Sequence, residues 1–165
     1  MTYKSFDPRI NIRNKIGYSI DFNHDDVDES TISVTDSYSD TVFLPLLMPS
    51  EVRTSELYPM PFIEMTLVSS PCFLHNIGGD IREQEAYIDF NIYYTDTDNI
   101  DATSFGKTVA DELVLQLMTY KNSVSTVSEL EPVDDGREII ETDGTGKQVV
   151  FHRIVKVKCK NWDNR

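Results

Sequence analysis

The side chains that could support metal or acid–base chemistry are scattered along this sequence. The three histidines, His24, His75 and His152, fall in different segments and lack the paired spacing of a zinc site. No serine stands in a nucleophile elbow, and Cys72 follows Pro71 without a recognisable catalytic context. The sequence therefore predicts a protein that is not an enzyme, with no catalytic residues, no metal ligands and no cofactor.

The acidic loops match the calcium-binding motif only in part. The segment from Asp21 through Asn23 to Asp25 begins like an EF-hand loop. However, Asp26 replaces the required glycine, and Ile32 replaces the bidentate glutamate. The glycine pairs also do not open a helix after a strand, as phosphate-binding loops do. We interpret these segments as solvated loops.

The charge balance limits the partners of the chain. Its 165 residues include 28 acidic and 15 basic side chains, which gives a formal net charge of −13. A nucleic-acid binder needs a basic patch that displaces counterions from phosphates, so specific nucleic-acid binding is not expected. The acidic excess fits three explanations: solubility, a saline habitat, or a surface that DNA passes without binding.

Length and composition predict one soluble domain over residues 1–165. No apolar run approaches the roughly 20 residues of a membrane-spanning helix, so no membrane partner is expected. The first residues lack the pattern of a signal peptide, which predicts that the protein stays in the compartment where it is made. Cys72 and Cys159 are therefore expected as buried free thiols rather than as a disulfide.

Two features near the end of the chain leave alternatives open. Lys156, Lys158 and Lys160 have a period of two, which places them on one face of a strand. A solvated face is the ordinary expectation there, and a docking patch is the alternative. Trp162, the only tryptophan, either seals the core or contributes to an interface.

The strongest structural pattern spans residues 62–122. Residues 62–69 and 85–95 alternate as strands, and a glycine pair at 78–79 lies between them as a hinge. One face of the second strand should pack on a helix, and the other, with Tyr87, Asp89, Asn91 and Tyr93, should meet water or a partner. Asp101 is expected to cap a helix over residues 102–121. The apolar stripe of this helix comprises Phe105, Val109, Ala110, Leu113, Val114, Leu117, Met118 and Tyr120.

The flanking segments add further strands. Residues 1–23 alternate as strands, and residues 31–35 and 41–46 form a hairpin. Residues 46–60 are bracketed by prolines and predict a contact arm with a short helical turn near residues 50–57. A turn at residues 132–136 precedes a closing hairpin of residues 137–141 and 148–160.

Together these elements predict an α+β fold, in which a mostly antiparallel sheet packs against one long amphipathic helix and carries an additional N-terminal hairpin. Residues 1–61 would supply the N-terminal strands and the arm, and residues 62–160 the sheet-plus-helix core.

Four segments carry a resemblance to a known family: Phe62-Ile63-Glu64-Met65, Gly78-Gly79-Asp80-Ile81-Arg82, Tyr87-Ile88-Asp89-Phe90-Asn91-Ile92-Tyr93-Tyr94-Thr95-Asp96 and Ala110-Asp111-Glu112-Leu113-Val114. Their order of strand, hinge, long strand, Asp turn and helix, followed by a hairpin, resembles that of the tail terminator (tail-completion) proteins of tailed viruses. The resemblance covers roughly residues 58–160. The N-terminal third differs, because that family opens with a helix where this sequence predicts strands.

The resemblance implies an α/β sandwich subunit that forms a homo-hexameric ring. Such a ring caps the tail tube, ends its polymerisation and joins it to the head-connector protein, and DNA passes through the lumen without specific binding. The implied location is the virion, at the tail or neck, after assembly in the host cytoplasm. The candidate interface residues are Leu46, Leu47, Met48, Arg53, Leu57, Tyr58, His75, Asn76, Ile77, Arg82, Tyr87, Asp89, Tyr93, Lys147 and Trp162.

Two alternatives remain at this point. One is another structural virion part from the neck, the head closure or the baseplate. The other belongs to a different class, a small soluble α/β binding domain or enzyme without a recognisable motif. The latter would be a monomer or dimer with a deep pocket and perturbed ionisable groups.

Overall fold

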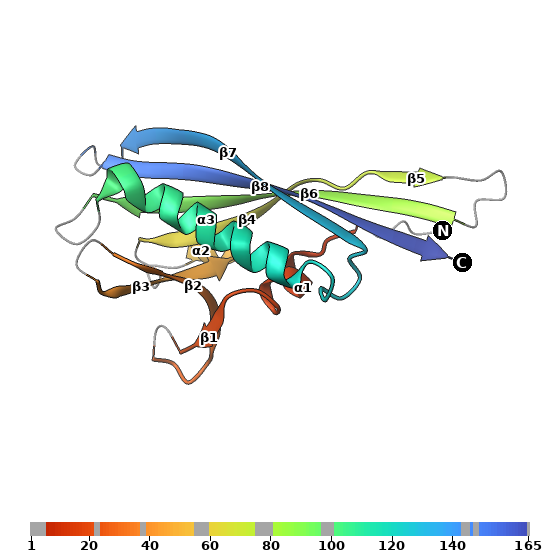
Figure 1. Ribbon diagram of the computed structural model, residues 1–165, viewed down its shortest axis with the longest axis horizontal. Helices are drawn as coiled ribbons and strands as arrows, with labels where there is room; N and C mark the ends of the chain where they lie inside the picture. Colours follow the sequence, from red (N-terminus) through yellow and green to blue (C-terminus); the bar gives the residue numbers. More distant parts are fainter. Residues whose placement is uncertain are drawn as a thin grey trace.

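Most of the described chain forms one large sheet, which the computed structural model shows with a long helix across one face (Figure 1). The structure describes residues 6–21, 24–36, 39–54, 60–74, 81–96, 101–142, 146 and 149–164. The strands are β1 (Tyr18–Ile20), β2 (Glu29–Thr35), β3 (Thr41–Leu47), β4 (Phe62–Ser69), β5 (Cys72–Leu74), β6 (Ile81–Thr95), β7 (Glu129–Thr142) and β8 (Val149–Asn164). The helices are α1 (Arg9–Arg13), α2 (Pro49–Thr54) and α3 (Ala102–Tyr120). No helix in this part of the chain is both long and apolar enough to span a membrane.

The predicted α+β fold class is wrong, because the protein is mostly β. The sheet is mixed, with the strand order β1-β2-β3-β4-β6-β8-β7, and β5 pairs with β6 beside this path. The predicted hairpin does form, as β2 and β3 pair antiparallel. However, β3 also pairs in parallel with β4 through Leu46↔Ile63 and Leu47↔Glu64. The hairpin is therefore part of the main sheet rather than an addition to it.

The beginning of the described chain is helical where strands were predicted. Helix α1 spans residues 9–13, and only the short β1 follows. Ile12 and Ile16, which are 0% and 2% exposed, are four residues apart and so turn toward the same core. Arg13 binds Glu51 of α2 at 2.8 Å, and Arg9 donates to the Met65 carbonyl of β4 at 3.0 Å. These contacts hold α1 against the rest of the molecule.

Helix α3 and strand β6 form the centre of the core, as predicted. Asp101 caps the helix by accepting a hydrogen bond from the backbone N–H of Thr103 at 3.0 Å. The inward side chains of β6 are completely buried, namely Ala86, Ile88, Phe90, Ile92 and Tyr94. The helix stripe is narrower than predicted, because Met118 and Tyr120 are 43% and 36% exposed.

The predicted turn at residues 132–136 is instead a bulge inside β7. The register of β7 against β8 shifts between Asp134 and Glu138, and pairing continues on both sides of the shift. Gly136 adopts a φ of +65°, and its N–H donates to the Asp134 carboxylate at 3.0 Å. The turn-forming residues thus bend a long strand without ending it.

Strands β5, β6 and β8 form a ribbon that extends past the helix-covered part of the molecule (Figure 1). Strands β6 and β8 pair over their whole length, from Ile81↔Asn164 to Thr95↔Val150. The sheet therefore has a body with α3 on one face and a projecting ribbon without a helix.

Candidate functional site

The face of the sheet opposite α3 is the candidate functional surface, and we call it the helix-free face. Its side chains come from the alternate positions of four neighbouring strands. They are Phe62, Glu64, Thr66 and Val68 of β4; Glu83, Glu85, Tyr87, Asp89, Asn91 and Tyr93 of β6; His152, Ile154, Lys156, Lys158, Lys160 and Trp162 of β8; and Glu129, Glu131 and Val133 of β7.

An aromatic and polar cluster occupies the body end of the helix-free face. Tyr93 stacks on His152 with ring centroids 4.5 Å apart, and Phe62 lies 5.2 Å from Tyr93 on the other side. The Asn91 amide nitrogen donates to the Thr66 hydroxyl at 3.2 Å, so its carbonyl oxygen accepts from Nε2 of His152 at 2.8 Å.

Burial favours the neutral form of His152 in this cluster. Its side chain is 8% exposed, and burial lowers the pKa of His152 below its ordinary value of 6.5 despite nearby carboxylates. Nδ1 is enclosed and has no hydrogen-bond partner among the described residues. A proton on Nδ1 would find no acceptor among the described residues, so the cluster suits a packed contact better than proton transfer.

A network of opposite charges runs along the ribbon end of the same face. Lys158 binds Glu85 at 2.9 Å, and Lys160 binds Glu83 at 3.1 Å. The Tyr87 hydroxyl donates to Glu85 at 2.6 Å, and this bond, followed by the one from Lys158, holds the pKa of Glu85 below its ordinary value. Because Glu83 and Glu85 are only 8% and 6% exposed, these bonds help to hold the ribbon where no helix covers it.

Between the cluster and the network lies an open hollow of about 600 Å³. Val68 of β4 and Val133 of β7 face it and are 58% and 53% exposed. Lys156 and Lys158 also line the hollow, with Asp89 beside them, and burial raises the pKa of Asp89 against the opposing effect of Lys156. The hollow combines apolar walls with charges of both signs, as protein-binding surfaces do.

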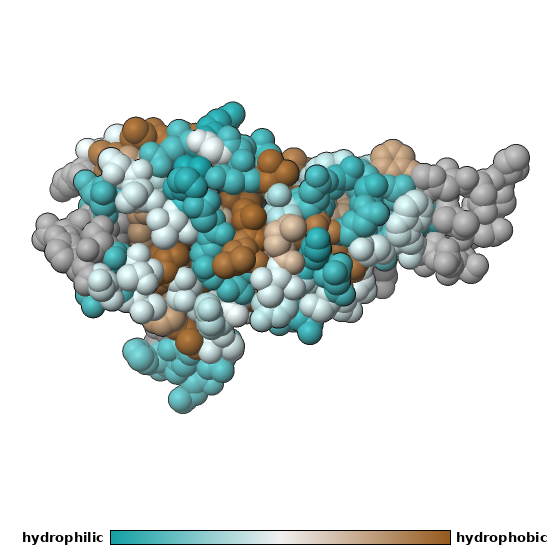
Figure 2. All heavy atoms as spheres, viewed as in Figure 1, coloured by the Kyte–Doolittle hydropathy of each residue, from teal (hydrophilic) through white to brown (hydrophobic). Residues whose placement is uncertain are grey.

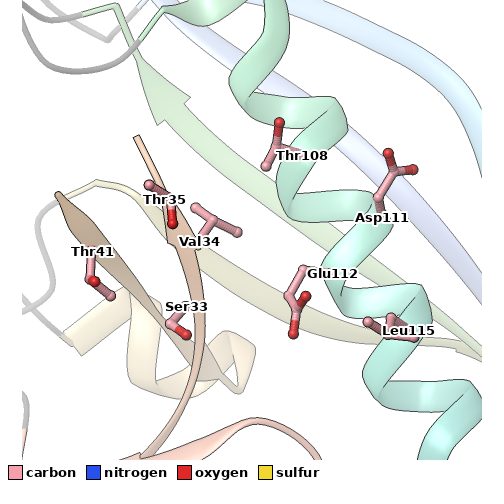
Figure 3. A pocket seen from close by; sticks show the side chains of 8 residues that line it. All are labelled: Ser33, Val34, Thr35, Thr41, Thr108, Asp111, Glu112 and Leu115. Atoms are coloured by element: carbon pink, nitrogen blue, oxygen red, sulfur yellow. The ribbon is translucent and has the colours of Figure 1, made fainter. Parts of the chain in front are cut away.

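A second hollow, of about 510 Å³, lies between α3 and the β2–β3 hairpin (Figure 3). It is lined by Thr108, Asp111, Glu112 and Leu115 of α3 and by Ser33, Val34, Thr35 and Thr41. Figure 3 shows Glu112 on the side of the helix that faces β2. The Asp111 carboxylate binds Lys107 at 2.6 Å, and Glu112 accepts from Gln116 at 2.7 Å.

The polar groups beneath α3 bind one another, apart from Nε of Arg153, which is buried and has no hydrogen-bond partner among the described residues. The Tyr94 hydroxyl donates to the Glu138 carboxylate, and Arg153 binds Asp134 at 2.7 Å. Burial and the Glu138 contact raise the pKa of Tyr94. No group of three histidine, cysteine, aspartate or glutamate side chains in the described ranges could hold a metal ion.

Four of the predicted interface residues lie on the helix-free face. Tyr87, Asp89 and Tyr93 are half-buried there, and Trp162 is 43% exposed at the ribbon end. Arg82 also lies in the ribbon part of β6, but it is only 9% exposed.

The predicted arm is partly inside the sheet. Leu46 and Leu47 lie in β3, where each is 2% exposed, and Met48 packs against the core. Arg53 belongs to α2. The other candidates fall outside the described residues, namely Leu57, Tyr58, His75, Asn76, Ile77 and Lys147.

The sequence prediction missed the apolar side chains of the site. Val68 and Val133 line the hollow, and Phe73 of β5 is 47% exposed on the ribbon. Val133 was not recognised as a strand residue because it falls in a segment whose residues are typical of turns. The spacing of two residues between the β8 lysines did indicate that Lys156 and Lys158, which line the hollow, lie on one face of the strand.

Comparison of the sequence with protein-family models and with curated protein sequences gives no match for this chain.

Proposed function

We propose that this protein is a structural virion protein of a tailed virus, a tail terminator whose ring caps the tail tube. In this role six copies form the ring, end polymerisation of the tube and join it to the head-connector protein. The resemblance carried by residues 62–65, 78–82, 87–96 and 110–114 supports the proposal from the sequence.

The observation that carries the proposal is the projecting ribbon with exposed aromatic side chains. Phe73 of β5 pairs with Glu83 of β6, which pairs with Trp162 of β8, so the three form one row across the ribbon. Phe73 and Trp162 are 47% and 43% exposed. Large exposed apolar side chains on an extended element are typical of contacts between proteins.

The charge of the chain supports a ring through which DNA passes. With a net charge of −13, copies of the subunit would present carboxylates to a central channel. Like charge repels phosphate and prevents adhesion of the DNA. A channel wall that proves basic when the assembled ring is imaged would contradict this part of the proposal.

The test combines mass measurement with a capping assay. Light scattering after size exclusion should give six times the 18.9 kDa of one chain, either alone or with the tail-tube protein of the same virus. In electron micrographs, tubes polymerised with the protein present should stop growing and carry a ring at one end. A chain that stays monomeric with tail-tube protein and leaves tube length unchanged would overturn the proposal.

A matched pair of variants tests the ribbon. The double change Phe73→Ser with Trp162→Ser should abolish ring formation or capping, because it removes the exposed aromatic pair. Ile140→Ser removes another exposed apolar side chain, 66% exposed on β7, and should leave both unchanged. Equal loss in both variants would indicate a general effect on folding, which circular dichroism would detect.

A further inference from the structure

Exposed aliphatic side chains are found on both faces of the sheet body. On the helix-free face, Val68 and Val133 border the hollow that also contains Lys156 and Lys158. On the opposite face, the outer side of α3 presents Leu115 and Met118, which are 58% and 43% exposed. Leu115 and Met118 are three residues apart, so both lie on the same side of the helix.

On the outer side of α3, acidic side chains lie next to the exposed apolar ones. Asp111 and Glu112 are one turn before Leu115, and we call these four residues, Asp111, Glu112, Leu115 and Met118, the helix patch. Figure 2 views the molecule from the helix side and shows hydrophobic areas among the hydrophilic ones along α3. Lys107 of α3 binds Asp111 at 2.6 Å and offsets part of the negative charge of the patch.

The hollow is the favourable place for an acidic patch to approach. Two lysines, Lys156 and Lys158, line it beside the carboxylates of Asp89 and Glu131, in a chain with a net charge of −13. Lys158 is already bound to Glu85 at 2.9 Å, so Lys156 is the cation best placed to meet a carboxylate of a partner. The Lys156 side chain is 55% exposed, and its ion pair with Asp135 is long, at 3.7 Å. It can therefore reach a carboxylate on another molecule.

We infer that the helix patch of one subunit docks into the hollow of the next subunit. The occupant is thus a second copy of this chain, with Leu115 and Met118 against Val68 and Val133, and with Asp111 and Glu112 toward Lys156. Each side combines exposed aliphatic side chains with charged ones, carboxylates on the helix patch and the Lys156 ammonium in the hollow, and this complementarity gives the contact its direction and register.

The positions of the two surfaces determine the symmetry of the assembly. Because they lie on opposite faces of one sheet, a single chain cannot use the same surface on both sides of the contact. Such contacts are head-to-tail, and they generate closed rings when the rotation between subunits closes. The inference rests on the proposed function, which requires a ring, and it identifies the contact between neighbouring subunits of that ring.

Charge reversal on each side, followed by mixing, tests the contact. One variant carries Asp111→Lys with Glu112→Lys, and the other carries Lys156→Glu. Each variant alone places like charges together and should lose roughly tenfold or more in assembly affinity. An equimolar mixture should assemble again, because each contact then joins opposite charges in either order around the ring.

Controls with the same change in charge separate this contact from a general charge effect. Lys15→Glu matches the lysine reversal, and Asp28→Lys with Asp40→Lys matches the acidic one; all three positions are exposed and outside both surfaces. These controls should assemble like the wild type. Circular dichroism and thermal melting of every variant would identify any that fail to fold, and Lys156→Ala would then replace the reversal, with a smaller loss expected.

The outcomes distinguish the inference from the proposed function. If rings form and cap tubes but the reversals have no effect, or the mixture does not reassemble, this contact is wrong and the function stands. If the mixture reassembles but the wild-type oligomer does not cap tail tubes, the contact stands and the function is wrong. A chain that remains monomeric in the presence of tail-tube protein overturns both.

Discussion

At the scale of single residues, burial determines what the ionisable side chains can do. Cys159 is completely buried, and burial raises the pKa of its thiol to about 12, whereas Cys72 is exposed. Both cysteines are free, as predicted, but the prediction that both are buried is wrong for Cys72. His152 shows the same influence, since burial favours its neutral form.

The two thiols should react at very different rates. In the native protein a disulfide reagent such as DTNB should modify Cys72 readily, because its thiol is accessible, and leave Cys159 unmodified. Addition of denaturant should release the second thiol. Cys72→Ser should abolish the native reaction, and rapid labelling of that variant would contradict the burial of Cys159.

His152 should make the protein less stable as the pH falls below neutrality. Its folded pKa lies below the ordinary value of 6.5, so the unfolded chain takes up a proton first as the pH falls. The stability is therefore complete above that value and is lost progressively as the pH falls through it toward the folded pKa. Urea unfolding between about pH 7 and 5 should show this decline.

The matched variants isolate this effect. His152→Gln retains a donor for Asn91 and should flatten the pH dependence in that interval. His24→Gln removes an exposed histidine and should keep the wild-type slope. An unchanged slope in His152→Gln would show that other groups cause the decline.

At the scale of elements, α3 can pack close to the sheet because the residue facing Tyr94, Gly106, has no side chain. A Cβ at Gly106 would lie 2.1 Å from the Tyr94 hydroxyl, which is too short for any real contact. Glycine in a helix costs about 1 kcal/mol relative to alanine, so the close approach accounts for its presence here. Tyr94 also contacts Phe105 and Phe151, at ring distances of 5.4 Å and 5.5 Å.

Gly106→Ala should therefore destabilise the protein although alanine favours the helix. Overpacking of a tight core costs about 1–3 kcal/mol, which exceeds the gain in helix propensity. Urea denaturation would measure the change. In Tyr94→Phe the clashing hydroxyl is absent, so the two substitutions together should cost less than the sum of their separate effects. A more stable Gly106→Ala variant would contradict this packing.

At the scale of the whole molecule, the carboxylates repel one another. The net charge of −13 is spread over a chain whose ion pairs are concentrated on β8, among them Arg153–Asp134, Lys158–Glu85 and Lys160–Glu83. Self-repulsion of this kind disfavours the compact state, and salt weakens it.

Added sodium chloride should therefore raise the melting temperature at neutral pH. The rise should occur mainly up to about 0.1–0.3 M, where the screening length falls below about 10 Å. Scanning calorimetry would record it, and sucrose at equal osmolality would control for effects unrelated to charge. A melting temperature that falls over this range would show that the ion pairs outweigh the repulsion.

The sequence alone determined the elements that depend on local pattern. The alternation of residues 62–69 and 85–95, the cap at Asp101 and the helix that follows are as predicted, because side-chain period and capping are local properties. The second strand starts earlier than predicted, at Ile81. The same holds for the hairpin of β2 and β3.

Only the tertiary structure decided how these elements combine. The parallel pairing of β3 with β4 depends on contacts between distant segments, and no local pattern specifies it. The bulge at Gly136 also depends on the partner strand, since the same residues would form a turn without β8. The exposure of Val68 and Val133 follows from that pairing, so the hollow between them could be recognised only once the strands were side by side.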